Sequence, residues 1–262
     1  MSKTRTRKKR RNASKLRAAR DEQVRFQWNQ RFSLTVVGLI SCLHLCGLAA
    51  LFSPASGIFN TQPLIDQDWG LHFHHLNSLA AFWHQDKITW GYNPFFMAGY
   101  PSNTIQDLSI KFFEWTALAL SAVSLSPLQW FKICAFLAMA SIPWLMYIAA
   151  ENLFLAHETK YFIAALAAFF GTIYWWNSLP REMFFYGMLG FPVASYLGIL
   201  GVSLFYRIAR SSEKFGWAHI GWLIFAMAIL PLHIQSIVSF LPPMIALLVI
   251  CLLYTSPSPR DS

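Results

Sequence analysis

Charge is scarce in this 262-residue chain, because only 13% of the residues are Asp, Glu, Lys or Arg. An average soluble domain has about 25% charged residues. Hydrophobic residues make up 55% of the chain and aromatic residues 16%, and the mean hydropathy is +0.40. This composition excludes an ordinary soluble globular domain and predicts a protein that lies mostly in a lipid bilayer.

Cysteine is also rare, and its placement carries no metal-finger signal. The chain has four cysteines, all in apolar runs: Cys42, Cys46, Cys134 and Cys251. Their spacing is not that of a zinc finger and indicates no disulfide framework.

The net charge of +9 comes from the first 31 residues. Residues 1–31 hold twelve Lys and Arg against Asp21 and Glu22, so the remainder of the chain sums to −1. A basic run such as residues 7–11 directly before an apolar segment is typical of a tail that is retained on the cytoplasmic side of the membrane. Nucleic-acid binding is the alternative interpretation. We favour a basic cytoplasmic tail and expect no nucleic-acid partner.

Apolar segments of membrane-spanning length follow the basic tail. The first, residues 32–52, can cross the ~30 Å hydrocarbon layer at about 1.5 Å per residue. We interpret it as a retained signal anchor, and not as a cleaved signal peptide, because the basic region before it is long and more spans follow. Further apolar windows predict about six crossings in all, at residues 128–150, 161–176, 188–206, 217–232 and 234–250.

This pattern predicts an all-α fold, a polytopic transmembrane helical bundle over residues 32–250. Multi-pass insertion into the cell inner (plasma) membrane, with the N-terminus in the cytoplasm, is the corresponding localisation. The sequence carries no signal for an oligomeric state.

Residues 110–125 decide the side on which later segments lie. The short basic loop 207–214 should be cytoplasmic like the N-terminus, so an even number of crossings must separate the two. The spans at 32–52, 128–150, 161–176 and 188–206 already give four. We therefore predict that 110–125, which carries Lys111 and Glu114, is a juxtamembrane or re-entrant helix.

Under this topology the polar motifs share one side of the membrane. Residues 54–127 become a large extracytoplasmic loop, and residues 177–187 return to that side. His233, at the break between the last two spans, emerges there as well.

Residues 251–262 are expected to be foreign to the natural protein. Eleven consecutive residues, 251–261, match one reading frame of a common transposase sequencing adapter. We interpret them as read-through and exclude 251–262 from the fold. The natural protein is expected to continue beyond Ile250, which makes this chain an N-terminal fragment.

Carboxylates and imidazoles are concentrated directly after the first span. Asp68 is a predicted N-cap of a helix over residues 69–84, and Asp68, His72 and His75 share one face of that helix. Three interpretations stay open: an amphipathic helix at the membrane interface, a divalent metal site, or a general base. Asp66 and Asp68 also form an Asp-x-Asp pair, which in glycosyl transfer holds a cation such as Mg or Mn against a diphosphate.

Three later residues are candidates for substrate binding or catalysis. Trp90 lies in an aromatic loop punctuated by Gly and Pro, which suits sugar stacking or an interfacial anchor. Arg181 is suited to a phosphate, and Glu182 to a metal or an acceptor hydroxyl. The alternative for these two neighbours is an idle, solvated charge pair. His44 and His219 are predicted to be helix-packing groups.

The order of the motifs resembles a known family. The chain is similar to the membrane proteins labelled 6-pyruvoyl-tetrahydropterin synthase-related, which look like relatives of the C-type (GT-C) polytopic glycosyltransferases. The resemblance covers about residues 30–250 and rests on short motifs in the family's order: Asp68 with His72, Trp90 with Pro94, Gly99 with Pro101, Glu182 with Gly190 and Pro192, and His233.

The resemblance implies a GT-C-like bundle that transfers a sugar from a polyprenyl-phosphate donor on the extracytoplasmic side. Asp68 would deprotonate the acceptor or position a divalent metal, and His72 or Arg181 would neutralise the departing phosphate. Glu182 would be a further catalytic residue, and Trp90 and His233 would bind substrate.

Two function classes are the alternatives to an enzyme. A non-catalytic membrane protein with this fold would bind a lipid-linked glycan or assist the export of an envelope polymer. A transporter is disfavoured, because transporter polar sites lie near the bilayer midplane and the polar cluster here lies in a loop.

Overall fold

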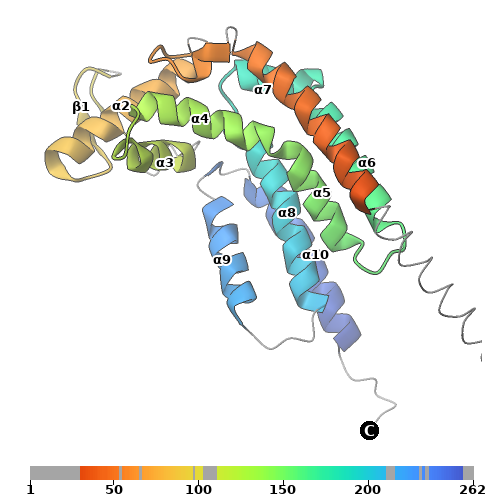
Figure 1. Ribbon diagram of the computed structural model, residues 1–262. Coiled ribbons are helices and arrows are strands. Elements are labelled where there is room, and N and C mark those ends of the chain that lie inside the picture. The colour runs from red at the N-terminus through yellow and green to blue at the C-terminus, as the bar shows by residue number, and fades with distance from the viewer. Residues whose placement is uncertain are drawn as a thin grey trace, which may run out of the picture.

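The computed structural model is almost entirely helical, which confirms the all-α prediction (Figure 1). It describes residues 30–52, 55–64, 67–96, 98–102, 111–210, 216–229, 232–233 and 236–255. Most of the predicted basic tail, and Asp66 of the predicted metal pair, lie outside the described residues.

The elements follow one another with short connections. A first helix, Gln30–Leu51, is followed by the 3₁₀ turn η1 (Ala55–Ile58), α2 (Trp69–Asp86), the antiparallel hairpin of β1 (Gly91–Asn93) and β2 (Tyr100–Ser102), α3 (Lys111–Ser121), α4 (Pro127–Ala140), α5 (Ile142–Leu153), α6 (Lys160–Trp175), α7 (Ser178–Phe185), α8 (Gly190–Arg210), α9 (Trp217–Ile229) and α10 (Ser236–Thr255). The first helix, α5, α6, α8 and α10 form one bundle, and α2, α3 and the hairpin extend sideways from one of its ends (Figure 1).

Two described helices are long and apolar enough to cross a membrane alone, the first helix and α8. Two further pairs qualify only when each is counted as one bent span: α4 with α5, at 44°, and α6 with α7, at 55°. α9 and the apolar part of α10 are shorter. Length and composition thus support two to four spans in the described part of the chain, fewer than the sequence predicted.

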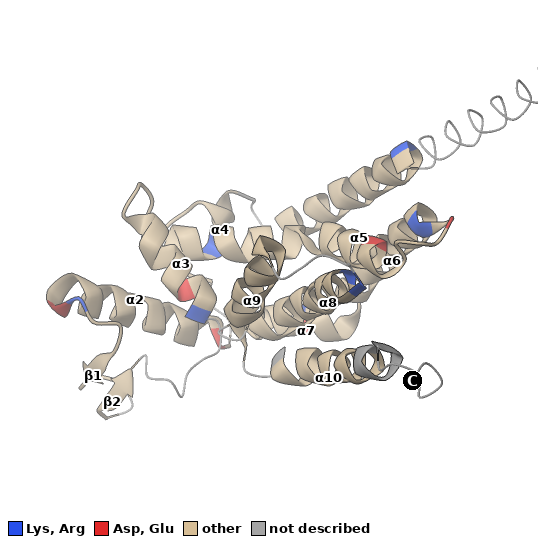
Figure 2. Ribbon diagram, turned by 90° about the horizontal axis from the view of Figure 1, so that it is seen from below, with Lys and Arg blue, Asp and Glu red and all other residues tan. Residues whose placement is uncertain are grey.

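Charged residues lie mainly at the ends of the bundle and along α2, α3 and α4 (Figure 2). The first helix carries only Arg31, and α8 only Arg207 and Arg210 in its last turn. α3 has 11 residues and is not among the candidate spans. Its Lys111 and Glu114 are both buried and form an ion pair with each other at 2.7 Å.

The bend between α4 and α5 follows from a proline. Residue 143 would normally donate its N–H to the carbonyl of Met139, four residues earlier, but Pro143 has none. Nε2 of the buried His44 lies 2.9 Å from that carbonyl oxygen and donates in place of the missing group. The first helix thereby satisfies a polar group that the bend exposes inside the bundle.

His44 also contacts the end of α6. The indole Nε1–H of Trp176 donates to His44 Nδ1 at 3.0 Å. Because an indole nitrogen only donates, Nδ1 is an acceptor and the ring proton lies on Nε2. Gly47, one turn after His44, leaves no room for a Cβ, which would lie 2.6 Å from the Trp176 ring. His44 is therefore a packing group, as predicted.

The first helix runs alongside α6 in the same direction. Val37 lies in one buried cluster with Tyr161 and Ala164 of the first half of α6, whereas His44 meets Trp176 just beyond the end of α6. This alignment carries the end of α6 to the end of the bundle where η1 and α2 lie (Figure 1).

A buried lysine ties the segment after the first helix to α4. The Lys132 ammonium, 1% exposed, donates to the carbonyls of Gly57, Asn60 and Gln62 and to the Asn60 side chain, at 2.6–2.9 Å. A buried charge is tolerated only when its donors are satisfied. Lys132 therefore fixes where the chain leaves the first span.

We expect His44→Phe to lower the free energy of unfolding by about 2–4 kcal/mol, because it leaves the Met139 carbonyl and the Trp176 indole without their partner. In a Pro143→Ala background, residue 143 regains an N–H for the Met139 carbonyl. His44→Phe should therefore lower the free energy of unfolding by at least about 1 kcal/mol less in that background than in the wild type. Unfolding in mixed detergent micelles measures both values. His84→Phe, at an exposed position of α2, is the control, and strictly additive effects of the two changes would contradict the assignment.

Candidate functional site

The amino end of α2 lies directly against the carboxyl end of α7. The backbone N–H of Asp68 donates to the Tyr186 carbonyl at 3.1 Å, and the Trp69 indole donates to the Phe184 carbonyl at 2.7 Å. His72 Nε2 donates to the Gly187 carbonyl at 3.0 Å. We call this contact, formed by residues 68–72 and 184–187, the α2–α7 junction.

Glycine at position 187 is what permits the close approach. Its φ is +80°, a left-handed conformation that side chains rarely adopt. A Cβ there would lie 2.6 Å from the backbone nitrogen of Trp69 and 3.0 Å from Cβ of Asp68. The backbone of the α7–α8 turn can therefore pack directly on the first residues of α2.

Aromatic rings of α2, α4 and α7 pack together at the junction. Trp69 is buried, and its ring meets Phe184 of α7 and Phe131 of α4 edge to face, with centroids 5.5 and 6.1 Å apart. Such pairs each add about 0.5–1.5 kcal/mol beyond the area they bury. His72, 5% exposed, lies in the same layer. The structure thus places the predicted catalytic imidazole of His72 among the packed aromatic rings of the junction.

The predicted carboxylates lie at this junction with less burial. Asp68 occupies the N-cap position of α2, as predicted, but its side chain does not bond to the first-turn N–H groups. Its carboxylate is half-buried and not used for capping. Glu182 and Arg181 are exposed on α7, and Glu182 lies one turn before Tyr186, whose carbonyl holds Asp68. The structure therefore brings Asp68 and the Arg181–Glu182 pair to adjoining elements.

His233 lies near this region, whereas Trp90 does not. The His233 ring packs against Phe191 in the first turn of α8, with centroids 5.6 Å apart. Burial lowers the pKa of His233, which favours the neutral ring. Trp90 is exposed and follows the opposite, carboxyl end of α2. An 18-residue helix, about 27 Å long at ~1.5 Å per residue, separates it from Asp68.

Metal ligands do not converge in the described residues. No group of three His, Cys, Asp or Glu side chains suited to a metal ion occurs among them. The described residues alone therefore do not make up a metal centre. The pairing of Asp68 with Asp66 for Mg or Mn stays a prediction, because Asp66 lies outside them.

An apolar groove of about 460 Å³ lies between the first helix and α6. Its walls include Ile40 and Leu43 on one side and Phe169 and Ile173 on the other, with His44 and Trp176 also lining it. It reaches Asn177, the N-cap residue of α7. The groove therefore leads from the apolar flank of the bundle to the helix that carries Arg181 and Glu182.

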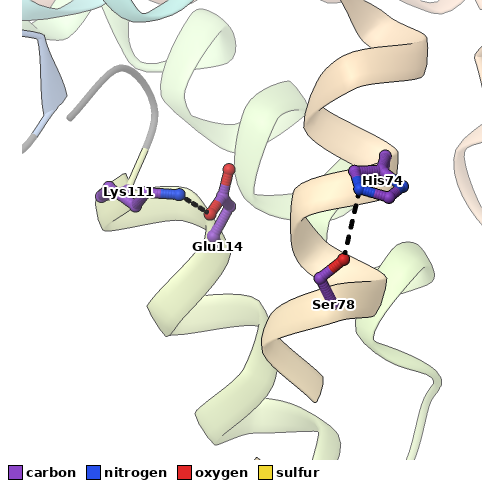
Figure 3. Close-up of polar contacts among 4 residues, drawn as sticks. All are labelled: His74, Ser78, Lys111 and Glu114. Carbon is purple, nitrogen blue, oxygen red and sulfur yellow. Dashed lines mark hydrogen bonds and ion pairs between the residues drawn. The ribbon is translucent and has the colours of Figure 1, made fainter. Parts of the chain in front are cut away.

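A second polar cluster on α2 was not singled out from the sequence. His74 Nε2 lies 3.4 Å from Ser78 Oγ and 3.4 Å from Asn93 Nδ2, and its ring stacks on Phe96 at 4.2 Å. Burial, and then the neighbouring His75, lower the pKa of His74. Figure 3 shows His74 and Ser78 on α2 and the Lys111–Glu114 pair on α3. The i, i+4 spacing of His74 and Ser78 was the available signal.

Comparison of the chain with protein-family models, with curated proteins and with solved structures found no match.

Replacing Gly187 by Ala should lower the free energy of unfolding by about 2 kcal/mol or more, because a Cβ both clashes with Trp69 and strains the left-handed backbone. Gly70→Ala is the matched control, since a Cβ at Gly70 meets nothing within 4 Å. That change should be neutral or stabilising by up to ~1 kcal/mol, because Gly70 lies in the first turn of α2 and alanine there restricts the unfolded chain. Equal effects of the two substitutions would show that the junction is not closely packed.

Proposed function

We propose that the chain belongs to a membrane glycosyltransferase of the GT-C type, which moves a sugar from a polyprenyl-phosphate donor to an acceptor on the extracytoplasmic side. The observation that carries the proposal is the α2–α7 junction. The backbone N–H of Asp68 bonds there to the end of α7, the helix that bears Arg181 and Glu182, at one end of an apolar bundle. Their side chains are the chemical groups that a transfer from a phosphate leaving group needs.

The reaction would use Asp68 as the general base. As the acceptor oxygen attacks the anomeric carbon, its proton passes to the Asp68 carboxylate. The bond between that carbon and the phosphate oxygen breaks, and its electron pair stays on the phosphate. Proton transfer of this kind contributes about 10²–10⁴-fold to a rate. A half-buried carboxylate that caps nothing is suited to this role.

Arg181 would bind the phosphate of the donor and of the product. Its guanidinium offers paired N–H donors that match phosphate oxygens. Negative charge on the leaving phosphate grows as the bond breaks, so a fixed cation nearby stabilises the transition state more than the ground state. Glu182, exposed beside it, would contact the acceptor or donor sugar.

The apolar groove supports a lipid-linked donor. Its walls are side chains of the first helix and α6, and its end at Asn177 lies one turn before Arg181. A polyprenyl chain in the groove would place its phosphate near the start of α7. Binding a donor by its chain orients the reacting carbon, and orientation is a large part of catalysis.

A non-catalytic protein that holds a lipid-linked glycan is the second candidate. The observation that favours it is the burial of His72, whose Nε2 is bonded to the Gly187 carbonyl. Such a ring supports the packing of the junction and is removed from direct contact with a substrate. Binding without transfer would use Arg181 and the groove in the same way.

We expect Asp68→Asn in the full-length protein to reduce sugar incorporation about 100-fold or more, because the amide cannot accept the acceptor proton. The assay follows labelled sugar from a polyprenyl-phosphate donor into the acceptor, with donor binding measured in parallel. Glu158→Gln, in the turn between α5 and α6, is the control and should leave incorporation unchanged. Unchanged incorporation in Asp68→Asn would remove the residue from the base role.

Binding of the donor by both wild type and Asp68→Asn, with transfer by neither, would select the non-catalytic candidate. Arg181→Gln should then weaken donor binding.

The proposed topology predicts that α2 and α7 face the same compartment. Single cysteines at Gln85 and Ser178, in a variant without the native cysteines, should react with an impermeant maleimide from the outside of intact cells. A cysteine at Glu158 should react only after the membrane is opened. Labelling of Gln85 and Ser178 from opposite sides would overturn both the topology and a shared site.

A further inference from the structure

A second cavity, at the other end of the bundle, lies between α8 and α9. It has a volume of about 480 Å³, within the ~300–1,000 Å³ range of small-molecule sites. Leu204, Ile208 and Phe225 give it apolar walls, and Arg207 and His219 lie at its polar part. The cavity shares no lining residue with the groove beside α6.

The guanidinium of Arg207 is held in place by buried polar groups. Its Nη1 donates to Asn152 Oδ1 at 3.2 Å, and Asn152, 2% exposed, lies 3.4 Å from Ser203 Oγ. Ser203 in turn donates to the Leu200 carbonyl at 2.7 Å. A guanidinium has five N–H donors. The bond to Asn152 thus orients the group and leaves it able to bind an anion in the cavity.

The start of α9 adds positive character to the same wall. Ala218 and His219, in the first turn of α9, line the cavity. The N–H groups and dipole at a helix start favour an anion. The Gly216 N–H donates to His219 Nδ1 at 3.1 Å, so the neutral ring carries its proton on Nε2.

We propose that this cavity binds an anionic phospholipid, with the phosphate on Arg207 and the start of α9 and an acyl chain along Leu204, Ile208 and Phe225. The occupant must be apolar at one end, because α9 has no charged residue and most of its side chains are exposed. It must be anionic at the other, because the guanidinium of Arg207 lines the cavity. Basic pockets between membrane helices recognise lipid headgroups by the same combination.

Native mass spectrometry of the full chain in detergent, with phosphatidylglycerol or phosphatidylcholine of identical acyl chains, tests the proposal. Wild type should bind the first phosphatidylglycerol at least about fivefold more tightly, the factor that corresponds to ~1 kcal/mol per basic residue. Arg207→Gln should abolish the preference, since glutamine keeps a polar amide but carries no charge. Arg210→Gln is the matched control, because Arg210 bonds Tyr206 and does not line the cavity.

The cavity itself is tested by filling it. Gly221 lines it, and a Cβ there meets nothing within 4 Å, so Gly221→Leu should fold normally and reduce phosphatidylglycerol binding at least about fivefold. Gly38→Leu on the first helix, where a Cβ also meets nothing, is the control.

Equal binding of the two lipids by wild type, or no effect of either Arg207→Gln or Gly221→Leu, would overturn the proposal. Displacement of the lipid by millimolar glycerol phosphate would also overturn it, by showing a site for a free phosphate compound. Neither result depends on the proposed transferase activity.

Discussion

The carbonyl of Met139 is the constraint on which the arrangement of the bundle depends. Pro143 cannot donate to it, so the α4–α5 span bends and the carbonyl needs another donor inside an apolar environment. His44 supplies that donor from the first helix and, through its other nitrogen, holds Trp176. One neutral imidazole thereby joins three segments that are far apart in the sequence, the first helix, the end of α4 and the end of α6.

The position of α7 and of the proposed site follows from this contact. α7 begins directly after Trp176, and its carboxyl end receives Asp68, Trp69 and His72 through backbone carbonyls. The junction is thus held together by hydrogen bonds to carbonyls, by aromatic packing and by close backbone contact at one left-handed glycine. Because charged side chains are not needed for packing there, Asp68 and the Arg181–Glu182 pair remain at its surface. The groove between the first helix and α6 then leads to the same place.

In the described part of the chain, charged side chains that contact buried polar groups have two kinds of role, and Arg207 is the exposed one among them. Lys132 and the Lys111–Glu114 pair are enclosed and satisfied by nearby oxygens or by each other, so they fix the loop after the first span and the fold of α3. Arg207 is different, since a buried amide orients it while it lines a cavity. Polar groups near a membrane are costly. A charge that is enclosed and satisfied has a structural role, whereas a charge that lines a cavity is suited to binding.

The sequence by itself determined the helical class, the apolar character of the helices, the capping position of Asp68 and the packing role of His44, because these follow from local hydropathy, spacing and side-chain chemistry. It also brought Asp68 and Glu182 to one side of the membrane in the predicted topology. Tertiary structure alone decided which groups meet: the burial of His72, the separation of Trp90 from the junction, the close contact at Gly187 and both cavities. Those features depend on how helices distant in sequence pack, and hydrophobic periodicity does not specify which helices become neighbours or where their side chains leave space.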